Sequence, residues 1–161
     1  MRGTVVCALT DGAEKGDAVA QASAISERLG LRLVLAHVVD GIAALGDGDE
    51  SMTMKADRVA ATRELAELVR DHGLDERAES RVAVGDPATL VGQIASEEAA
   101  DVIVVGARRR GWGRGLESKL AEELEAETPV PVLVATPRVR GTRRRASANG
   151  VPRSCGSRIL I

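Results

Sequence analysis

Aromatic side chains are almost missing from this chain, which has one Trp and neither Tyr nor Phe among its 161 residues. Proteins that bind single-stranded nucleic acid stack the bases on aromatic rings, so this scarcity argues against such a function. The hydrophobic residues are mainly Ala, Val and Leu. We therefore expect a core of aliphatic side chains at the faces of sheets and helices.

The features of membrane and secreted proteins are also lacking. No apolar run approaches the roughly 20 residues that a membrane span needs, and Met1-Arg2-Gly3 leads into a predicted strand without a signal-peptide pattern. The two cysteines, Cys7 and Cys155, form neither a metal-binding spacing nor a disulfide framework. We expect a cytoplasmic protein in which Cys7 is a small core residue.

Charge is distributed unevenly along the chain. The net charge is −2, but residues 138–161 contain seven Arg and no acid, so that this end carries +7 and the part before it −9. From residue 136 onward the composition shifts to Arg, Gly, Ser and Pro without periodicity, which is typical of disorder. We expect one domain over residues 1–136 and a disordered Arg-rich tail over 137–161. Two interpretations of the tail stay open, a solvated extension and a contact for an acidic partner.

Short apolar runs alternate with segments of helical periodicity before the tail. Apolar runs predict strands at residues 4–9, 31–39, 101–106 and 132–135, and the alternation of apolar and polar residues over 77–84 predicts a further, more exposed strand. Four segments predict helices, at residues 17–29, 56–72, 88–99 and 116–124. Between the second strand and the second helix, residues 42–54 hold glycines and several acids and predict a connection without regular structure.

Capping residues mark the ends of two of these helices. Asp17 is the predicted N-cap of the first helix, and Gly30 ends it. Asp86 is predicted to cap the third helix, with Pro87 at the first helical position, where a backbone N–H is not needed. The alternation of strands and helices predicts an α/β fold, with a parallel sheet, right-handed crossovers and helices on both faces.

A glycine- and arginine-rich segment follows the fourth predicted strand and is the first place to look for a site. Gly106 ends the apolar run, and three consecutive arginines and further glycines follow up to Ser118. Ligands of open parallel sheets bind beyond the carboxyl ends of the strands, and glycines let a phosphate approach backbone N–H groups. An ordinary solvated loop is the alternative interpretation.

Catalytic motifs are harder to find. The two histidines, His37 and His72, have no Cys or Ser partner at a motif spacing, and no Gly-Lys-Ser/Thr of a Walker A loop occurs. A lone histidine in a buried strand is more often a packing residue than a ligand, and we assign His37 that role.

Several short landmarks occur together in a characteristic order. They are Asp11-Gly12, His37-Val38-Val39, Gly85-Asp86-Pro87-Ala88, Val104-Val105-Gly106-Ala107-Arg108 and Pro129-Val130-Pro131-Val132-Leu133-Val134. In this order and spacing the chain resembles the universal stress protein family over about residues 3–136. The resemblance implies an open five-stranded parallel sheet of order 3-2-1-4-5, similar to the adenine nucleotide alpha-hydrolase-like fold. It also implies a homodimer formed through the fifth strands.

The resemblance also implies where an adenine nucleotide would bind. Members that bind ATP carry Gly, two residues, Gly, nine residues and then Gly-Ser or Gly-Thr after the fourth strand. Here Gly106 matches the first glycine, Arg109 stands at the second, and the closing pair falls near Glu117-Ser118 or Ser118-Lys119. A side chain at position 109 hinders the close backbone approach that glycine allows, whereas the arginines supply charge for a polyphosphate or a smaller nucleotide.

The nucleoside half of that site is kept better than the phosphate half. Asp11 matches the acid that holds the ribose and adenine side, and Val38 stands where the second strand reads adenine. The implied binding residues are the ends of strands one, two and four and the loop after strand four: Leu9, Asp11, Val38, Val105, Gly106, Arg109, Ser118 and Lys119.

Three functions follow as alternatives. The first is a non-enzymatic stress-response module that binds ATP or another adenine nucleotide, with no metal beyond one that accompanies the nucleotide. The second is a dimeric interaction protein that no longer binds nucleotide. The third is slow ATP hydrolysis, for which Asp11 is the one good candidate to hold a metal near the phosphates.

Overall fold

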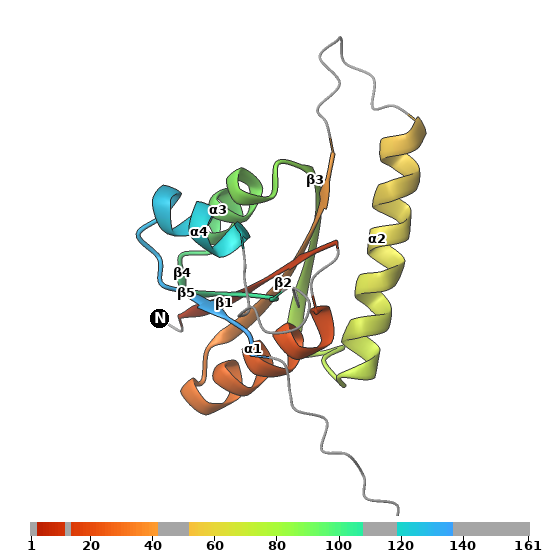
Figure 1. The fold of residues 1–161 in the computed structure, drawn as a ribbon. Helices are drawn as coiled ribbons and strands as arrows, with labels where there is room; N and C mark the ends of the chain where they lie inside the picture. Colours follow the sequence, from red (N-terminus) through yellow and green to blue (C-terminus); the bar gives the residue numbers. More distant parts are fainter. Residues whose placement is uncertain (1–2, 12–13, 42–51, 108–118, 137–161) are drawn as a thin grey trace, which may run out of the picture.

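The structure is a computed structural model that describes residues 3–11, 14–41, 52–107 and 119–136, in which five strands alternate with four helices (Figure 1). The strands are β1 (Thr4–Thr10), β2 (Arg32–Asp40), β3 (Ala78–Gly85), β4 (Ala100–Val105) and β5 (Val132–Val134). The helices are α1 (Lys15–Leu29), α2 (Met52–Asp71), α3 (Pro87–Glu97) and α4 (Lys119–Glu127). Each strand begins and ends within one residue of its prediction.

All five strands are parallel, in the order β3-β2-β1-β4-β5, which confirms the predicted fold. The central strand, β1, pairs with β2 as far as Thr10 opposite Val38. On its other side it pairs with β4 as far as Ala8 opposite Val105. The crossover through α1 therefore joins β1 to β2 on one side of it within the sheet. The crossover through α3 leads from β3 back across to β4, on the other side of β1.

Helices cover both faces of the sheet (Figure 1). α1 and α2 pack on one face over a core that includes Leu35 and Leu65, and α3 and α4 pack on the other over a core that includes Val34 and Leu124. Side chains alternate along a strand, so each central strand supplies both cores and its sequence is almost continuously apolar.

Cys7 is a core residue, as predicted. It lies in the middle of β1, is 0% exposed, and packs in the core under α1 and α2. Burial raises the pKa of the Cys7 thiol to about 12, because a thiolate would lose its hydration there. The thiol is therefore protonated and inert in the folded protein.

Two of the three predicted caps are confirmed. Gly30 ends α1 in the left-handed conformation, with φ of 66°, where a side chain would be strained. Pro87 is the first residue of α3, and the Asp86 carboxylate accepts a hydrogen bond of 2.9 Å from the backbone N–H of Thr89. Hydrogen bonds from the side chain of Thr89 and from this N–H favour the charged carboxylate and lower the pKa of Asp86 below its ordinary value of 3.8.

The prediction of Asp17 as the N-cap of α1 is wrong. The helix begins two residues earlier, at Lys15, after Glu14, whose side chain makes no capping hydrogen bond. The Glu14 N–H instead donates to the carbonyl of Ala107, 3.2 Å away, which ties the start of α1 to the end of β4. Asp17 lies in the first turn, where a carboxylate is stabilised by the helix dipole.

The second helix begins earlier than predicted. Residues 52–54, assigned to an irregular connection, are the first residues of α2. Met52 is 88% exposed, so packing does not explain this start. Met, Lys and Ala are good helix formers and extend the helix beyond its packed part. The rest of that connection, 42–51, lies outside the described residues, as do 108–118 and the tail, 137–161.

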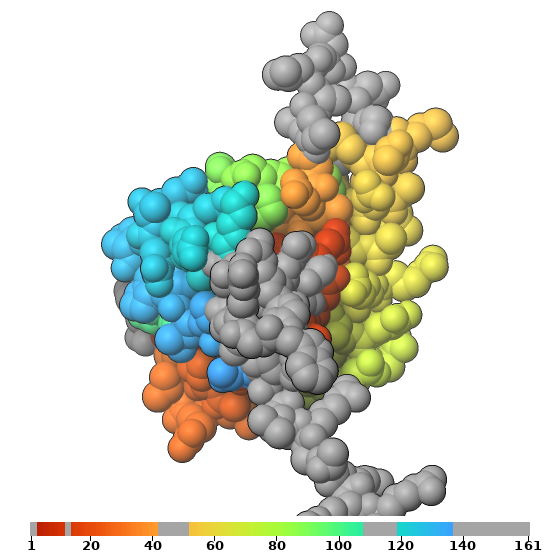
Figure 2. Space-filling view, viewed as in Figure 1, coloured from red at the N-terminus to blue at the C-terminus, as the bar shows by residue number. Residues whose placement is uncertain are grey.

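Helix α2 lies at the opposite side of the molecule from α4 and β5 (Figure 2). In the space-filling view, α2 (yellow) runs along one side, and α4 and β5 (cyan to blue) form the other (Figure 2). None of the helices in the described part of the chain combines the length and the apolar character needed to cross a membrane.

Candidate functional site

The carboxyl ends of β1 and β4 form the place where the topology predicts a ligand. The chain leaves β1 toward β2 and leaves β4 toward β5, so the connections diverge between these two strands. A crevice outside the carboxyl ends of the strands at such a switch point is the usual binding site in open α/β sheets.

The structure brings the nucleoside half of the predicted site together at this edge. Leu9 is 1% exposed and Val38 and Val105 are 0% exposed, so these side chains belong to the cores and only their backbones could meet a ligand. Gly106 follows Val105 and is half-buried. The side chain of Asp11, just after β1, is 61% exposed and reaches solvent.

Of the predicted phosphate half beyond Gly106, the structure describes Lys119 alone. Arg109 and Ser118 lie outside the described residues. Lys119 is the first residue of α4, its side chain is 88% exposed, and its ammonium forms an ion pair of 3.2 Å with Glu123 one turn later. Lys119 thus forms a surface ion pair, and such a pair contributes little to stability.

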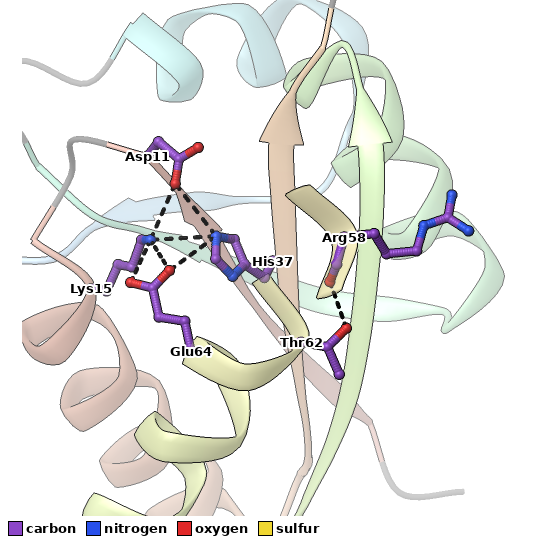
Figure 3. Close-up of polar contacts among 6 residues, drawn as sticks. All are labelled: Asp11, Lys15, His37, Arg58, Thr62 and Glu64. Atoms are coloured by element: carbon purple, nitrogen blue, oxygen red, sulfur yellow. Dashed lines mark hydrogen bonds and ion pairs between the residues drawn. The ribbon is translucent and has the colours of Figure 1, made fainter. Parts of the chain in front are cut away.

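A group of charged and polar side chains also meets at this edge, between β1, β2 and the two helices of one face (Figure 3). We call it the Lys15 cluster; it consists of Asp11, Lys15, His37 and Glu64. The Lys15 Nζ lies 2.8 Å from both carboxylate oxygens of Glu64, 3.3 Å from Oδ1 of Asp11 and 3.3 Å from Nε2 of His37. The side chain of Lys15 is only 13% exposed.

His37 is the buried member of the cluster, at 1% exposed. Its Nε2 lies 3.6 Å from Oδ1 of Asp11 and 3.8 Å from Oε2 of Glu64. Because an ammonium can only donate, the contact with Lys15 requires the lone pair of Nε2 to face the cluster, and the proton of the neutral ring is then on Nδ1. Among the described residues nothing pairs with that buried Nδ1.

A small pocket opens beside the cluster, toward α2. It has a volume of about 140 Å³, and acidic, small and aliphatic side chains line it: Asp11, His37, Val39, Asp57, Ala60, Ala61 and Glu64. This volume holds several water molecules.

Sequence reasoning found one member of the cluster, Asp11, and missed the others. The burial of His37 is as predicted, but its ring also contacts three charged groups, so it is more than a packing residue. Lys15 follows Asp11 by four residues across the end of β1, a spacing that carries no recognised motif. Glu64 lies on α2, and no local signal in the sequence connects it to β1.

The family comparison covers the whole described part of the chain. The family model described as "Universal stress protein family" matches residues 1–136. A search of curated proteins finds no match.

Solved structures share the fold. A universal stress family protein from Burkholderia pseudomallei is 24% identical, with a TM-score of 0.62 over 82% of this chain and 94% of its own. A universal stress protein in complex with cAMP is 23% identical, with a TM-score of 0.57 over 83% and 96%. The universal stress protein from Archaeoglobus fulgidus in complex with dAMP is 17% identical, with a TM-score of 0.56 over 84% and 98%. With the strand order, the landmark motifs and the family model in agreement, this chain belongs to the universal stress protein family.

Proposed function

We propose that this chain is a non-enzymatic stress-response module that binds an adenine nucleotide at the carboxyl ends of β1 and β4. The observation that carries the proposal is the position of Asp11 and Gly106, which flank the point where the crossovers diverge. Two family members of the same fold have been solved with cAMP and with dAMP, which supports an adenine nucleotide as the ligand class.

The chemistry of the two positions suits such a ligand. An ionised carboxylate accepts hydrogen bonds from ribose hydroxyls or from an amino group, and Asp11 presents its side chain to solvent at this edge. Gly106 offers a backbone without a Cβ, which a phosphate or ribose can approach closely. The ligand would then be held mainly by its nucleoside half.

Calorimetric titration of ATP, ADP, AMP and cAMP into the wild type and Asp11→Ala tests this proposal. We expect the variant to bind at least about tenfold more weakly, a loss of roughly 1.4 kcal/mol, since a charge-assisted hydrogen bond is worth about that or more. Asp71→Ala, which removes an exposed acid at the far end of α2, should bind like the wild type. Equal affinities of the wild type and Asp11→Ala would remove Asp11 from the site, and a wild type that binds none of the four would favour the interaction-protein alternative.

We also propose that two chains pair through β5. Among the residues that the structure describes, β5 pairs only with β4, so its outer side is a free edge. Leu133 and Val134 are 46% and 39% exposed there, and they are among the large apolar side chains that remain exposed in the described part of the chain. Pairing of two copies under two-fold symmetry would satisfy the edge and bury these side chains.

The hydrogen bonds of β5 allow a test that separates pairing from folding. The Pro131 carbonyl accepts from Ile103 and the Ala135 N–H donates to Val105, so by alternation Leu133 also faces β4, whereas Val134 directs its N–H outward. Val134→Pro should therefore convert a dimer to a monomer in light scattering with little loss of stability. The control Leu133→Pro should destabilise the fold itself. A wild-type mass of one chain across a dilution series would contradict the proposal.

A further inference from the structure

The Lys15 cluster has the ligand atoms of a metal site with a lysine ammonium among them. Asp11, His37 and Glu64 each offer one ligand atom, and these three atoms lie within 4.8 Å of one another. They come from three separate elements, the end of β1, the end of β2 and the middle of α2, which the fold holds together. One imidazole with two carboxylates is a donor set that suits late first-row divalent ions.

His37 supports this interpretation independently of the acids. The ring is 1% exposed and held in the β2 strand, and its Nε2 lone pair faces the two carboxylates. With the ring proton on Nδ1, as the contact with Lys15 requires, Nε2 is the nitrogen that can ligate a metal ion. The cluster is therefore not a set of solvated acids on a helix, because its nitrogen ligand is buried and already oriented.

We propose that the Lys15 cluster is a binding site for a divalent transition-metal ion such as Zn²⁺, and that Lys15 is a tethered cation that the metal displaces. The ammonium contacts all three ligand side chains, at 2.8 to 3.3 Å. With Lys15 in place the two carboxylates share one positive charge. A divalent ion neutralises both, and the long lysine side chain, anchored at the first residue of α1, moves into solvent.

The geometry needs only side-chain movement to accept the ion. Ligand atoms around a tetrahedral zinc ion lie about 3.4 Å apart, given bonds of about 2.1 Å. The three ligand atoms, which lie within 4.8 Å of one another, must therefore approach each other by up to about 1.4 Å. Asp11 and Glu64, whose side chains are 61% and 46% exposed, can rotate toward the fixed His37 ring. The adjacent pocket of about 140 Å³ has room for the water that completes the coordination.

The proposal is independent of nucleotide binding, with which it shares only Asp11. Glu64 and His37 lie on the face covered by α1 and α2, and neither is among the residues assigned to the nucleotide. The test accordingly uses the metal alone, so that its outcome and that of the nucleotide titration can be told apart.

The experiment is a Zn²⁺ titration of the full chain followed by the imidazole signals in NMR and by calorimetry. The chain has two histidines, His37 and His72, so binding at the cluster should shift the signals of His37 and leave those of His72 in place. Lys15→Met removes the competing charge while keeping the length of the side chain. We expect it to bind Zn²⁺ about tenfold more tightly than the wild type, with the same shift of His37.

Two further variants identify the ligands. Lys15→Met with Glu64→Gln should lose the gain in affinity, whereas Lys15→Met with Glu67→Gln, an exposed acid on the same helix, should keep it. Circular dichroism checks that each variant is folded. Three results would overturn the proposal: His37 signals that do not move with Zn²⁺ in the wild type, an affinity of Lys15→Met no higher than that of the wild type, or an equal loss with Glu64→Gln and Glu67→Gln.

Discussion

The two faces of the sheet differ at the carboxyl ends of the strands. On the face under α3 and α4, the buried side chains of β2 are all apolar, and the last of them is Val38, which precedes the exposed Asp40. On the face under α1 and α2, Leu33 and Leu35 are followed by His37 and the charges of the Lys15 cluster. One face thus ends in a closed aliphatic core and the other in a polar site, so the chemistry that the side chains offer lies on the second face.

Truncating a core leucine should lower the free energy of unfolding more than the other changes. The loss should be similar on the two faces of the sheet. Leu65, on α2, is 1% exposed, and Leu124, on α4, is 0% exposed. Leu65→Ala and Leu124→Ala should each lower the free energy of unfolding by about 2–5 kcal/mol, because each leaves a cavity in a close-packed core. Urea denaturation measures both. Only Leu65→Ala should also shift the imidazole signals of His37, and a shift in both variants would show that the two cores are coupled.

Removing a charge from the Lys15 cluster, which lies at the face under α1 and α2, should lower the free energy of unfolding by an intermediate amount. Among the described residues, Glu64→Gln leaves the Lys15 ammonium, 13% exposed, with Asp11 as its remaining charged partner. Because Glu64 itself is 46% exposed and solvent screens the pair, we expect a loss of about 1 kcal/mol, nearer the value of a surface pair than of a buried one. Glu67→Gln on the same helix is the control and should change stability little. Equal unfolding midpoints for the two variants would mean that the cluster does not stabilise the fold.

The smallest effect should come from the cap of α3, on the opposite face. The pKa of Asp86 is lowered in the folded protein by the hydrogen bonds from Thr89, so its contribution to stability is complete above the unfolded pKa and is lost as the pH falls through the folded value. Asp86→Ala should therefore be less stable than the wild type at neutral pH, with a difference that shrinks below about pH 4. Asp86→Asn, which keeps a capping oxygen without a charge, is the control. A difference that is independent of pH would contradict this assignment.

The sequence predicts the framework of this protein better than its site. Strand positions follow from apolar runs, and Gly30, Asp86 and Pro87 mark helix ends because their conformations are local. The start of α1 carries no such local signal, since the Glu14 side chain makes no capping bond and the Glu14 N–H donates to Ala107, a residue that only the fold brings near. The strand order came from the resemblance to a family, not from the pattern alone.

The side chains of the site are even harder to predict from the sequence than the helix ends. Asp11 stands at the end of a strand, where a ligand is expected from topology. Lys15 and Glu64 are ordinary charged residues on helices until the fold places an ammonium 2.8 Å from a carboxylate. General statistics on buried histidines describe the burial of His37 correctly but carry no information on which neighbours meet its ring.

The position of Cys7 offers a way to time the opening of this protein. A disulfide reagent attacks the thiolate, and the Cys7 thiol, with its pKa of about 12 and no exposed surface, can react only after β1 separates from the sheet. In a Cys155→Ser chain, Cys7 is the single cysteine left to modify. Fraying of a helix end does not expose a residue in the central strand, so the rate of modification would count only openings of the whole sheet. Because the Cys7 thiol is inert in the folded molecule, the rate of its modification reports the rate of global unfolding.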